Sequence, residues 1–236
     1  MGRIFEKRKY KMFARYARMS KAFTRIGREI EIAVRLGGPD PKGNSRLRLT
    51  IQNAKSVNMP KDRVEAAIKR ATQKDTTGYQ EVVYEGIAPH GIAVMVECAT
   101  DNPTRTVANM RHIFSRHGGS LGTTGSVSFL FERKGLIRIP ASQVQNIDDF
   151  ELELIDHGLD DLTQEGDELL IYTSFQDYGK MQKFLEEKGI EVKSAELQYL
   201  PTTMKELPEE KAKEVQEFID ILEEDDDVQS VFHNMA

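Results

Sequence analysis

The spacing of apolar residues along this chain changes across the polar stretch from Gln73 to Gly78. Before that stretch, apolar residues recur every three or four positions, as in helices with one buried side. After it they alternate in steps of two, as in strands with one buried face. A change of period across a polar connection is typical of a junction between two separately packed cores. We therefore predict a domain boundary near Gly78.

The part before this boundary is predicted to be a bundle of three short helices. The first covers residues 20–36 and ends at the Gly37-Gly38-Pro39-Asp40-Pro41 run, which breaks a helix. The second covers residues 45–57, and the third begins near Pro60, because proline suits a first helical turn. The predicted inward residues are Phe23, Ile26, Ile30, Ala33, Val34, Leu47, Ile51, Ala54, Val64, Ala67, Ile68 and Ala71.

The part after the boundary mixes strands and helices. The predicted strands are 81–86, 92–100, 127–131, one from Leu136, 168–173, 192–200 and 228–232, and the predicted helices are 103–117, 148–158, 178–189 and 208–223. The last helix and strand have too little apolar surface to be stable alone, so we expect them to return to the sheet that begins at residue 80.

The predicted fold class is α+β with several domains. It consists of an N-terminal three-helix bundle and two small α/β domains of the ferredoxin-like type, the third inserted in the second. The predicted boundaries are 1–78 for a basic helical domain, 79–135 plus 201–236 for an α+β domain, and 136–200 for the inserted α+β domain.

Basic and acidic residues are separated along the chain near the same predicted domain boundary. Residues 1–70 contain 19 Lys and Arg against 6 Asp and Glu, a balance of +13, whereas residues 71–236 contain 14 against 32, a balance of −18. The formal net charge of −5 conceals this division. The like charges of a cationic domain repel one another, which costs free energy. Binding to a polyanion neutralises these charges and releases counterions, which favours binding. Nucleic acid, either DNA or rRNA, is therefore the predicted partner of the N-terminal part.

Candidate contacts to nucleic acid lie on one side of the predicted helices. In the first helix, Lys21, Arg25, Arg28 and Arg35 fall within about 80° of one another, opposite the apolar set. Upstream, basic residues between Arg3 and Arg18 alternate with aromatic ones, which suits phosphate contact combined with base stacking. A solvated basic surface is the alternative interpretation. The candidate nucleic-acid-binding residues are Lys21, Arg25, Arg28, Arg35, Arg46, Arg48, Lys55, Arg105 and Arg116.

Two features of the second part are open to two interpretations each. Arg105, Asn109, His112 and Arg116 share one face of the predicted helix from Pro103, where they would contact phosphate or RNA, or pair with nearby acidic residues. The glycine-rich run 117–126 could hold a phosphate through backbone N–H groups. A tight connection from helix to strand is favoured for that run, because no Gly-Lys-Ser/Thr follows it.

The sequence gives little support for an enzyme, a metal or a cofactor. The five histidines are scattered, with no partners at ligand spacing, so no metal or cofactor is expected. A phosphodiesterase that uses Asp225 to Asp227 is the one catalytic alternative. The run from Glu223 to Asp227 is more simply a solvated turn. The lone Cys98 alternates with apolar residues and is predicted to be a buried structural thiol.

The short length of the apolar runs constrains where the protein can be located. No run approaches the roughly 18 apolar residues needed to span a bilayer, so no membrane partner is expected. The basic start lacks the apolar core of a secretory signal, although an organellar presequence is an alternative. We predict a cytoplasmic protein. A monomer is favoured, with the oligomeric state otherwise open.

Several segments in order resemble the YebC/PmpR family, which includes mitochondrial translational activators. They are 23–25, 35–41, 44–48, 58–62, 84–86, 100–106, 117–123 and 125–127, among them Asn44-Ser45-Arg46-Leu47-Arg48 and Thr100-Asp101-Asn102-Pro103-Thr104-Arg105-Thr106. The resemblance implies a cytoplasmic, cofactor-free protein with a helical N-terminal domain and two α+β domains. The family usually opens with Gly-His-Ser-Lys-Trp, and this chain has Gly2-Arg3-Ile4-Phe5-Glu6 there. Contacts of that opening segment therefore do not carry over.

Residues and resemblance together predict a non-enzymatic nucleic-acid-binding regulator of gene expression. Some members of the family are described as DNA-binding transcriptional regulators, and others as ribosome-associated factors that assist translation. The first role is the primary prediction, and a ribosome-associated translation factor that contacts rRNA is the alternative. No predicted helix carries a clear set of base-reading side chains.

Overall fold

The structure is a computed structural model that describes residues 3–73 and 78–236, with side chains described from residue 19 onward. The chain forms two compact units, Met1–Gln80 and Glu81–Ala236. Its described residues make a mixed α+β protein with seven α-helices and two four-stranded antiparallel sheets.

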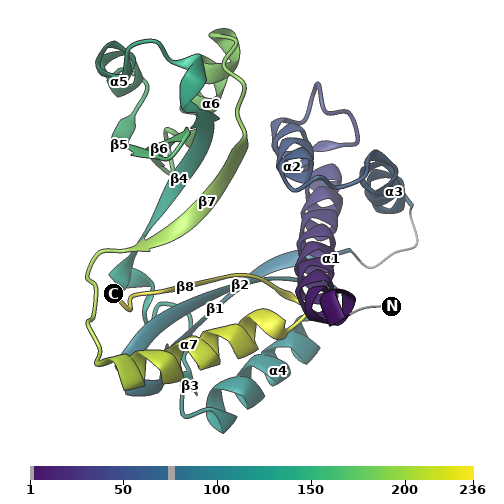
Figure 1. Ribbon diagram of the computed structural model, residues 1–236, viewed down its shortest axis with the longest axis vertical. Helices are drawn as coiled ribbons and strands as arrows, with labels where there is room; N and C mark the ends of the chain where they lie inside the picture. The colour runs from purple at the N-terminus through teal and green to yellow at the C-terminus, as the bar shows by residue number, and fades with distance from the viewer. Residues whose placement is uncertain (1–2, 74–77) are drawn as a thin grey trace. The chain divides into compact units, whose positions relative to one another are not determined.

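The first unit contains three helices, α1 (Arg3–Gly37), α2 (Ser45–Ser56) and α3 (Lys61–Ala71) (Figure 1). The predicted helices are confirmed, except that α1 begins well before residue 20. The early turns are rich in Arg, Lys and Ala, which favour helix, but they lack the apolar period on which the prediction depended. The core of this unit consists of Ile26, Ile30, Ala33, Val34, Leu47, Ala54, Val64 and Ala67.

The connection between α1 and α2 is folded around the buried side chain of Asn44. Its Oδ1 accepts from the backbone N–H of Leu47 at 3.0 Å, which caps α2. Its Nδ2 donates to the carbonyl oxygens of Ala33 at 2.7 Å and Gly38 at 2.8 Å. A Cβ on Gly37 would lie 2.7 Å from the Asn44 side chain, so only glycine fits there. One amide thus ties the end of α1 to the start of α2.

The first sheet of the second unit has the strand order β3-β1-β2-β8. Its elements are β1 (Gln80–Ala88), β2 (Ile92–Thr100), α4 (Pro103–Arg116), β3 (Ser120–Leu121), α7 (Glu209–Glu224) and β8 (Val228–His233). Helices α4 and α7 lie side by side against this sheet (Figure 1), and the rings of Phe114 and Phe218 meet edge to face at 5.0 Å. Strand β8 pairs with β2, from Val94 opposite His233 to Cys98 opposite Val228. This pairing confirms that the last strand returns to the first sheet.

The second sheet has the strand order β5-β6-β4-β7. Its elements are β4 (Phe131–Pro140), α5 (Ile147–Ile155), β5 (Leu159–Glu165), β6 (Glu168–Ser174), α6 (Tyr178–Glu187) and β7 (Ser194–Pro201). The His157 ring stacks on Phe184 at 3.9 Å between centroids, which joins the residues after α5 to α6. Near β4, the buried Phe131 belongs to the same apolar cluster as Met95 of the first sheet.

One predicted strand was wrong and two strands were missed, of which the short β3 lies in the run predicted to be a connection. Residues 127–131 do not form a strand, because a 3₁₀ turn occupies Ser128–Leu130 and β4 begins only at Phe131. Strand β5 was missed, because its sequence is acidic and lacks a clear apolar alternation. It lies at the edge of the sheet and pairs with β6 alone, so it needs less apolar surface than a central strand.

Candidate nucleic-acid interface

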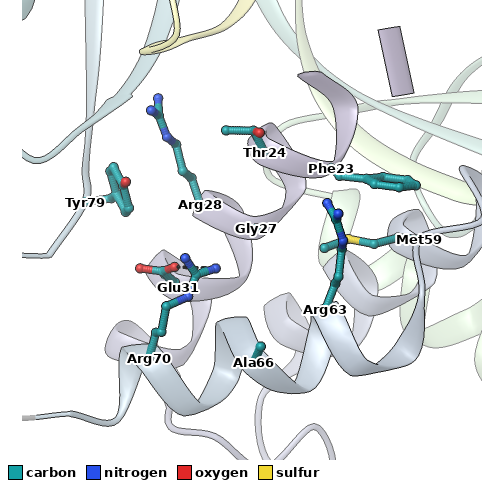
Figure 2. A pocket seen from close by; sticks show the side chains of 10 residues that line it. All are labelled: Phe23, Thr24, Gly27, Arg28, Glu31, Met59, Arg63, Ala66, Arg70 and Tyr79. Atoms are coloured by element: carbon teal, nitrogen blue, oxygen red, sulfur yellow. Dashed lines mark ion pairs between the residues drawn. The ribbon is translucent and has the colours of Figure 1, made fainter. Parts of the chain in front are cut away.

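Helices α1 and α3 of the first unit border a cavity of about 330 Å³, which we call the α1–α3 groove (Figure 2). Its lining residues are Phe23, Thr24, Gly27, Arg28, Glu31, Met59, Arg63, Ala66, Arg70 and Tyr79. The volume lies within the range of pockets that hold small ligands, which begins at about 300 Å³.

Each end of the groove combines an arginine with an aromatic ring. The guanidinium carbon of Arg63 lies 5.6 Å from the ring centroid of Phe23, and that of Arg28 lies 4.9 Å from the ring centroid of Tyr79. Figure 2 shows the first pair, with Met59 beside it, at one end and the second pair at the other. Guanidiniums next to aromatic faces are the groups that proteins use to hold phosphates and stack bases of single strands.

Glu31 places one carboxylate among these arginines. Its Oε1 lies 3.3 Å from Nη2 of Arg70, and the Glu31 side chain is only 11% exposed whereas that of Arg70 is 63% exposed. Burial raises the pKa of the Glu31 carboxyl, and the nearby guanidiniums, Arg70 first, only partly offset this rise. The three arginines of the groove outnumber its one acid, so the groove retains a positive charge that suits an anionic ligand.

The structure brings together only part of the predicted basic set. Arg28 lines the groove. Lys21 and Arg35 are exposed and Arg25 is partly exposed, and none of the three lines it, although the charge of Arg35 also acts on Glu31. On α2, Lys55 is exposed, and Nη1 of the half-buried Arg48 donates to the carbonyl oxygen of Pro41 at 3.4 Å. Arg46 is also half-buried. The basic and aromatic side chains between Arg3 and Arg18 lie outside the described side chains.

Sequence reasoning missed the contribution of α3. Arg63, Ala66 and Arg70 line the groove, and they follow one another at spacings of three and four residues. That spacing places them on one face of a helix and was a usable signal. Phe23 was assigned to the core alone, and it is indeed only 8% exposed, although its ring also lines the groove.

The predicted stripe on α4 is partly an ion-paired surface. Arg105 donates from Nη2 to Asp101 at 2.8 Å and to Asp227 at 3.0 Å, and Asn109 donates to Asp225 at 3.3 Å. Pairing with nearby acids, one of the two interpretations, therefore describes these two residues. Arg116 and His112 are exposed, and no acidic group in the described residues pairs with Arg116.

Comparison with known proteins places the whole chain in one family. Residues 3–74 match the family described as "TACO1/YebC protein N-terminal domain", and residues 79–235 match "TACO1/YebC second and third domain". The chain belongs to the TACO1/YebC family.

Full-length relatives and one solved structure agree with this membership. A protein of Myxococcus xanthus is 52% identical over all of both chains, and one of Cytophaga hutchinsonii is 53% identical over all of this chain and 99% of its own. Both are named "Probable transcriptional regulatory protein". The crystal structure of a conserved hypothetical protein from Aquifex aeolicus is 41% identical and superposes with a TM-score of 0.79, covering 92% of this chain and 90% of that one.

In this TACO1/YebC chain, backbone N–H groups in and just after the glycine-rich run donate to the side chain of Glu85. The Glu85 side chain accepts from the backbone N–H groups of Gly125 and Val127 at 2.8 Å and of Ser128 at 2.9 Å. Burial alone would raise the pKa of Glu85, but these hydrogen bonds outweigh it and the pKa is lowered. Of these three residues only Gly125 belongs to the run, and within the run Gly119 and Gly122 donate to the carbonyl oxygens of Phe114 at 2.9 Å and Glu85 at 2.8 Å. These internal hydrogen bonds favour the connecting role.

The acidic run at the end of α7 is not a simple solvated turn. Asp227 is 3% exposed and accepts from Thr106 Oγ1 at 2.8 Å as well as from Arg105. Its own N–H donates to Asp225 Oδ1 at 2.9 Å. The expectation of a solvated run is therefore wrong for Asp227, because this carboxylate joins the start of α4 to the start of β8.

Three further observations concern location, metals and the thiol. None of the helices in the described ranges is long and apolar enough to cross a bilayer. Within the same ranges no group of three or more His, Cys, Asp or Glu side chains is arranged to hold a metal ion. Cys98 is buried at 1% exposure, which confirms the prediction of a buried thiol.

Proposed function

We propose that the protein is a non-enzymatic regulator of gene expression that binds nucleic acid through its first unit. The observation that carries this proposal is the α1–α3 groove, which is lined by Arg28, Arg63 and Arg70 and in which Arg28 and Arg63 lie beside aromatic rings. The excess of basic residues in the first 70 positions supports it, because charge of one sign attracts a polyanion beyond the groove itself. Lys21, Arg25, Arg35, Arg46, Arg48 and Lys55 are proposed as further phosphate contacts.

The names of the relatives favour DNA as the target. Both full-length relatives described above are named as probable transcriptional regulators, and we propose the DNA-binding form of that role for this chain. Ribosome association through rRNA is the second candidate. It is favoured by the arginine and aromatic pairs of the groove, because single-stranded RNA exposes base faces that duplex DNA keeps stacked.

The test is nucleic-acid binding by the full-length protein at several salt concentrations. Fluorescence anisotropy with labelled duplex DNA and single-stranded RNA should show affinity that falls steeply with salt, with a slope of about −4 to −5 if about six phosphates are contacted. A slope flatter than about −1 would remove the electrostatic basis of the proposal.

Sucrose-gradient sedimentation of a lysate, with and without nuclease, separates the two candidates. Cosedimentation with ribosomes and little preference among duplex sequences would favour rRNA, whereas a large affinity ratio between an operator and random duplex would favour transcriptional control.

The proposal includes the domain organisation of the chain. We propose three domains, 1–78, 79–135 with 201–236, and 136–200. The last is supported by its β-α-β-β-α-β order of elements, which is the ferredoxin-like order, while the first sheet begins with two consecutive strands and departs from it. We also propose a cytoplasmic monomer that acts without a cofactor.

A further inference from the structure

We infer that the α1–α3 groove holds one unstacked guanine base of a single-stranded nucleic acid. This inference rests on the proposed function, because it names the ligand that the same groove would take. Three observations carry it: the open space above Gly27, the buried carboxylate of Glu31, and the arginine and aromatic pairs at both ends.

The floor of the groove is kept free of side chains. Gly27 lies inside α1, where glycine makes a helix less stable than alanine would. No close packing demands glycine, since a Cβ at this position would meet no atom within 4 Å and would project into the groove. On the facing helix α3, Ala66 lines the same hollow with a single methyl group. A flat ring could therefore lie against the α1 backbone at Gly27.

The side walls are suited to a ring. Phe23 and Met59 line one end of the groove and Tyr79 lines the other, so aromatic and thioether groups border it at both ends (Figure 2). Arg63 and Arg28, which lie over the two aromatic rings, place their positive charges where the phosphates on either side of a bound base would pass. Proteins usually recognise a nucleotide within a single strand by stacking its base on an aromatic ring while guanidinium groups bind the neighbouring phosphates.

Glu31 gives the groove a preference among bases. A carboxylate offers only acceptors, and guanine alone presents two adjacent N–H donors, N1–H and N2–H, on its Watson–Crick edge. Adenine and cytosine would bring a ring-nitrogen acceptor next to the carboxylate, and uracil would bring two carbonyl oxygens. Arg70, at 3.3 Å from Oε1, holds the carboxylate in place and reduces the cost of its burial.

The test measures binding of the full-length protein to four labelled RNA heptamers by fluorescence anisotropy. Each has three uridines on either side of a central guanine, adenine, cytosine or uracil. The parent protein should bind the guanine heptamer about tenfold more tightly than the others, the size expected for one bidentate base contact.

Gly27→Ala fills the floor of the groove. It should weaken binding of the guanine heptamer about tenfold, as expected for the loss of one stacked base, while the melting temperature stays equal or rises. Gly179→Ala is the matched control, because Gly179 also lies in a helix, α6, and a Cβ there also meets no atom within 4 Å. A glycine that served only the fold would not give higher stability together with weaker binding.

Glu31→Gln replaces one acceptor by a donor. It should bring the guanine and adenine heptamers to within about twofold of each other, because an amide matches the donor and acceptor pattern of adenine. Glu65→Gln, on the exposed surface of α3, removes the same charge from the same unit and should leave the preference unchanged.

The outcomes separate this inference from the proposed function. Equal binding of all four heptamers by the parent, or unchanged binding by Gly27→Ala, overturns the guanine pocket while salt-dependent binding still supports a nucleic-acid-binding protein. If the parent binds neither the heptamers nor duplex DNA, the proposed function itself fails.

Discussion

Arg105 on α4 donates from Nη2 to Oδ2 of Asp227, 122 positions further along the chain, at a distance of 3.0 Å. The Asp227 side chain is 4% exposed, while that of Arg105 is 49% exposed, so the arginine covers a carboxylate that is otherwise nearly sealed from water. The hydroxyl groups of Thr100 and Thr106 also donate to the same carboxylate. This contact therefore ties the first turn of α4 to the residue that precedes β8.

We expect Arg105→Ala to lower the urea midpoint of unfolding, because it removes the guanidinium that donates to the buried Asp227. Asp227→Ala should cost about 2–3 kcal/mol of unfolding free energy, since it removes the buried acceptor shared by Arg105 and Thr106. Arg116→Ala is the control on the same helix and should shift stability by less than about 0.5 kcal/mol. Equal midpoints for the Arg105 and Arg116 variants would show that the Asp227 contact contributes nothing to stability.

Glu85 should make stability depend on pH. Its folded pKa is lowered, so its contribution is complete above the unfolded value of about 4.3 and is lost as the pH falls through the folded pKa. We expect Glu85→Gln to cost about 1–3 kcal/mol near neutral pH, because three backbone N–H groups lose a charged acceptor, and to cost less in acid. Urea unfolding at neutral pH and at about pH 3.5 measures both values. A deficit that does not shrink in acid would contradict the role of the ionised carboxylate, and the exposed Glu151→Gln serves as the control.

Asn44→Ala should destabilise the first unit by about 2–4 kcal/mol, because it removes a helix cap and leaves the buried carbonyl oxygens of Ala33 and Gly38 without their donor. Asn44→Asp keeps the acceptor for Leu47 but loses both N–H donors, so it should remain destabilising. Thermal unfolding followed by circular dichroism reports both, with the exposed Ser56→Ala as reference. If Asn44→Asp were as stable as the parent, the cap alone would explain the role of Asn44.

Arg63→Ala should weaken nucleic-acid binding across sequences and make the salt slope shallower by about 0.7 to 0.9, the contribution of one phosphate contact. Lys61→Ala is its charge-matched control, because Lys61 lies on α3 outside the groove and pairs with Glu65 at 3.5 Å. Anisotropy titrations at four or more salt concentrations measure the slopes. Identical slopes for the two variants would mean that the groove contributes no more than general surface charge.

Local patterns in the sequence determined the helices of the first unit and most strands of the second. The apolar period of three to four residues placed α2 and α3 within a residue or two, since amphipathic spacing is a property of neighbouring positions. The return of β8 to β2 was also predictable, because α7 and β8 alone have too little apolar surface to form a core. The missed strand β5 shows where this reasoning fails, since an edge strand with acidic residues carries no such period.

Only the tertiary structure decided which charged groups are free to meet a ligand. Composition showed that the first unit is basic, but packing of α1 against α3 is what brings Arg28 near Arg63 and Arg70 around one hollow. In the same way, Glu85 reaches N–H groups 40 or more positions away and Arg105 reaches Asp227 across 122 positions, so both groups make internal contacts that local patterns do not show. The periodicity of an element is set by residues a few positions apart, whereas the partner of a charge is set by whichever distant segment packs beside it.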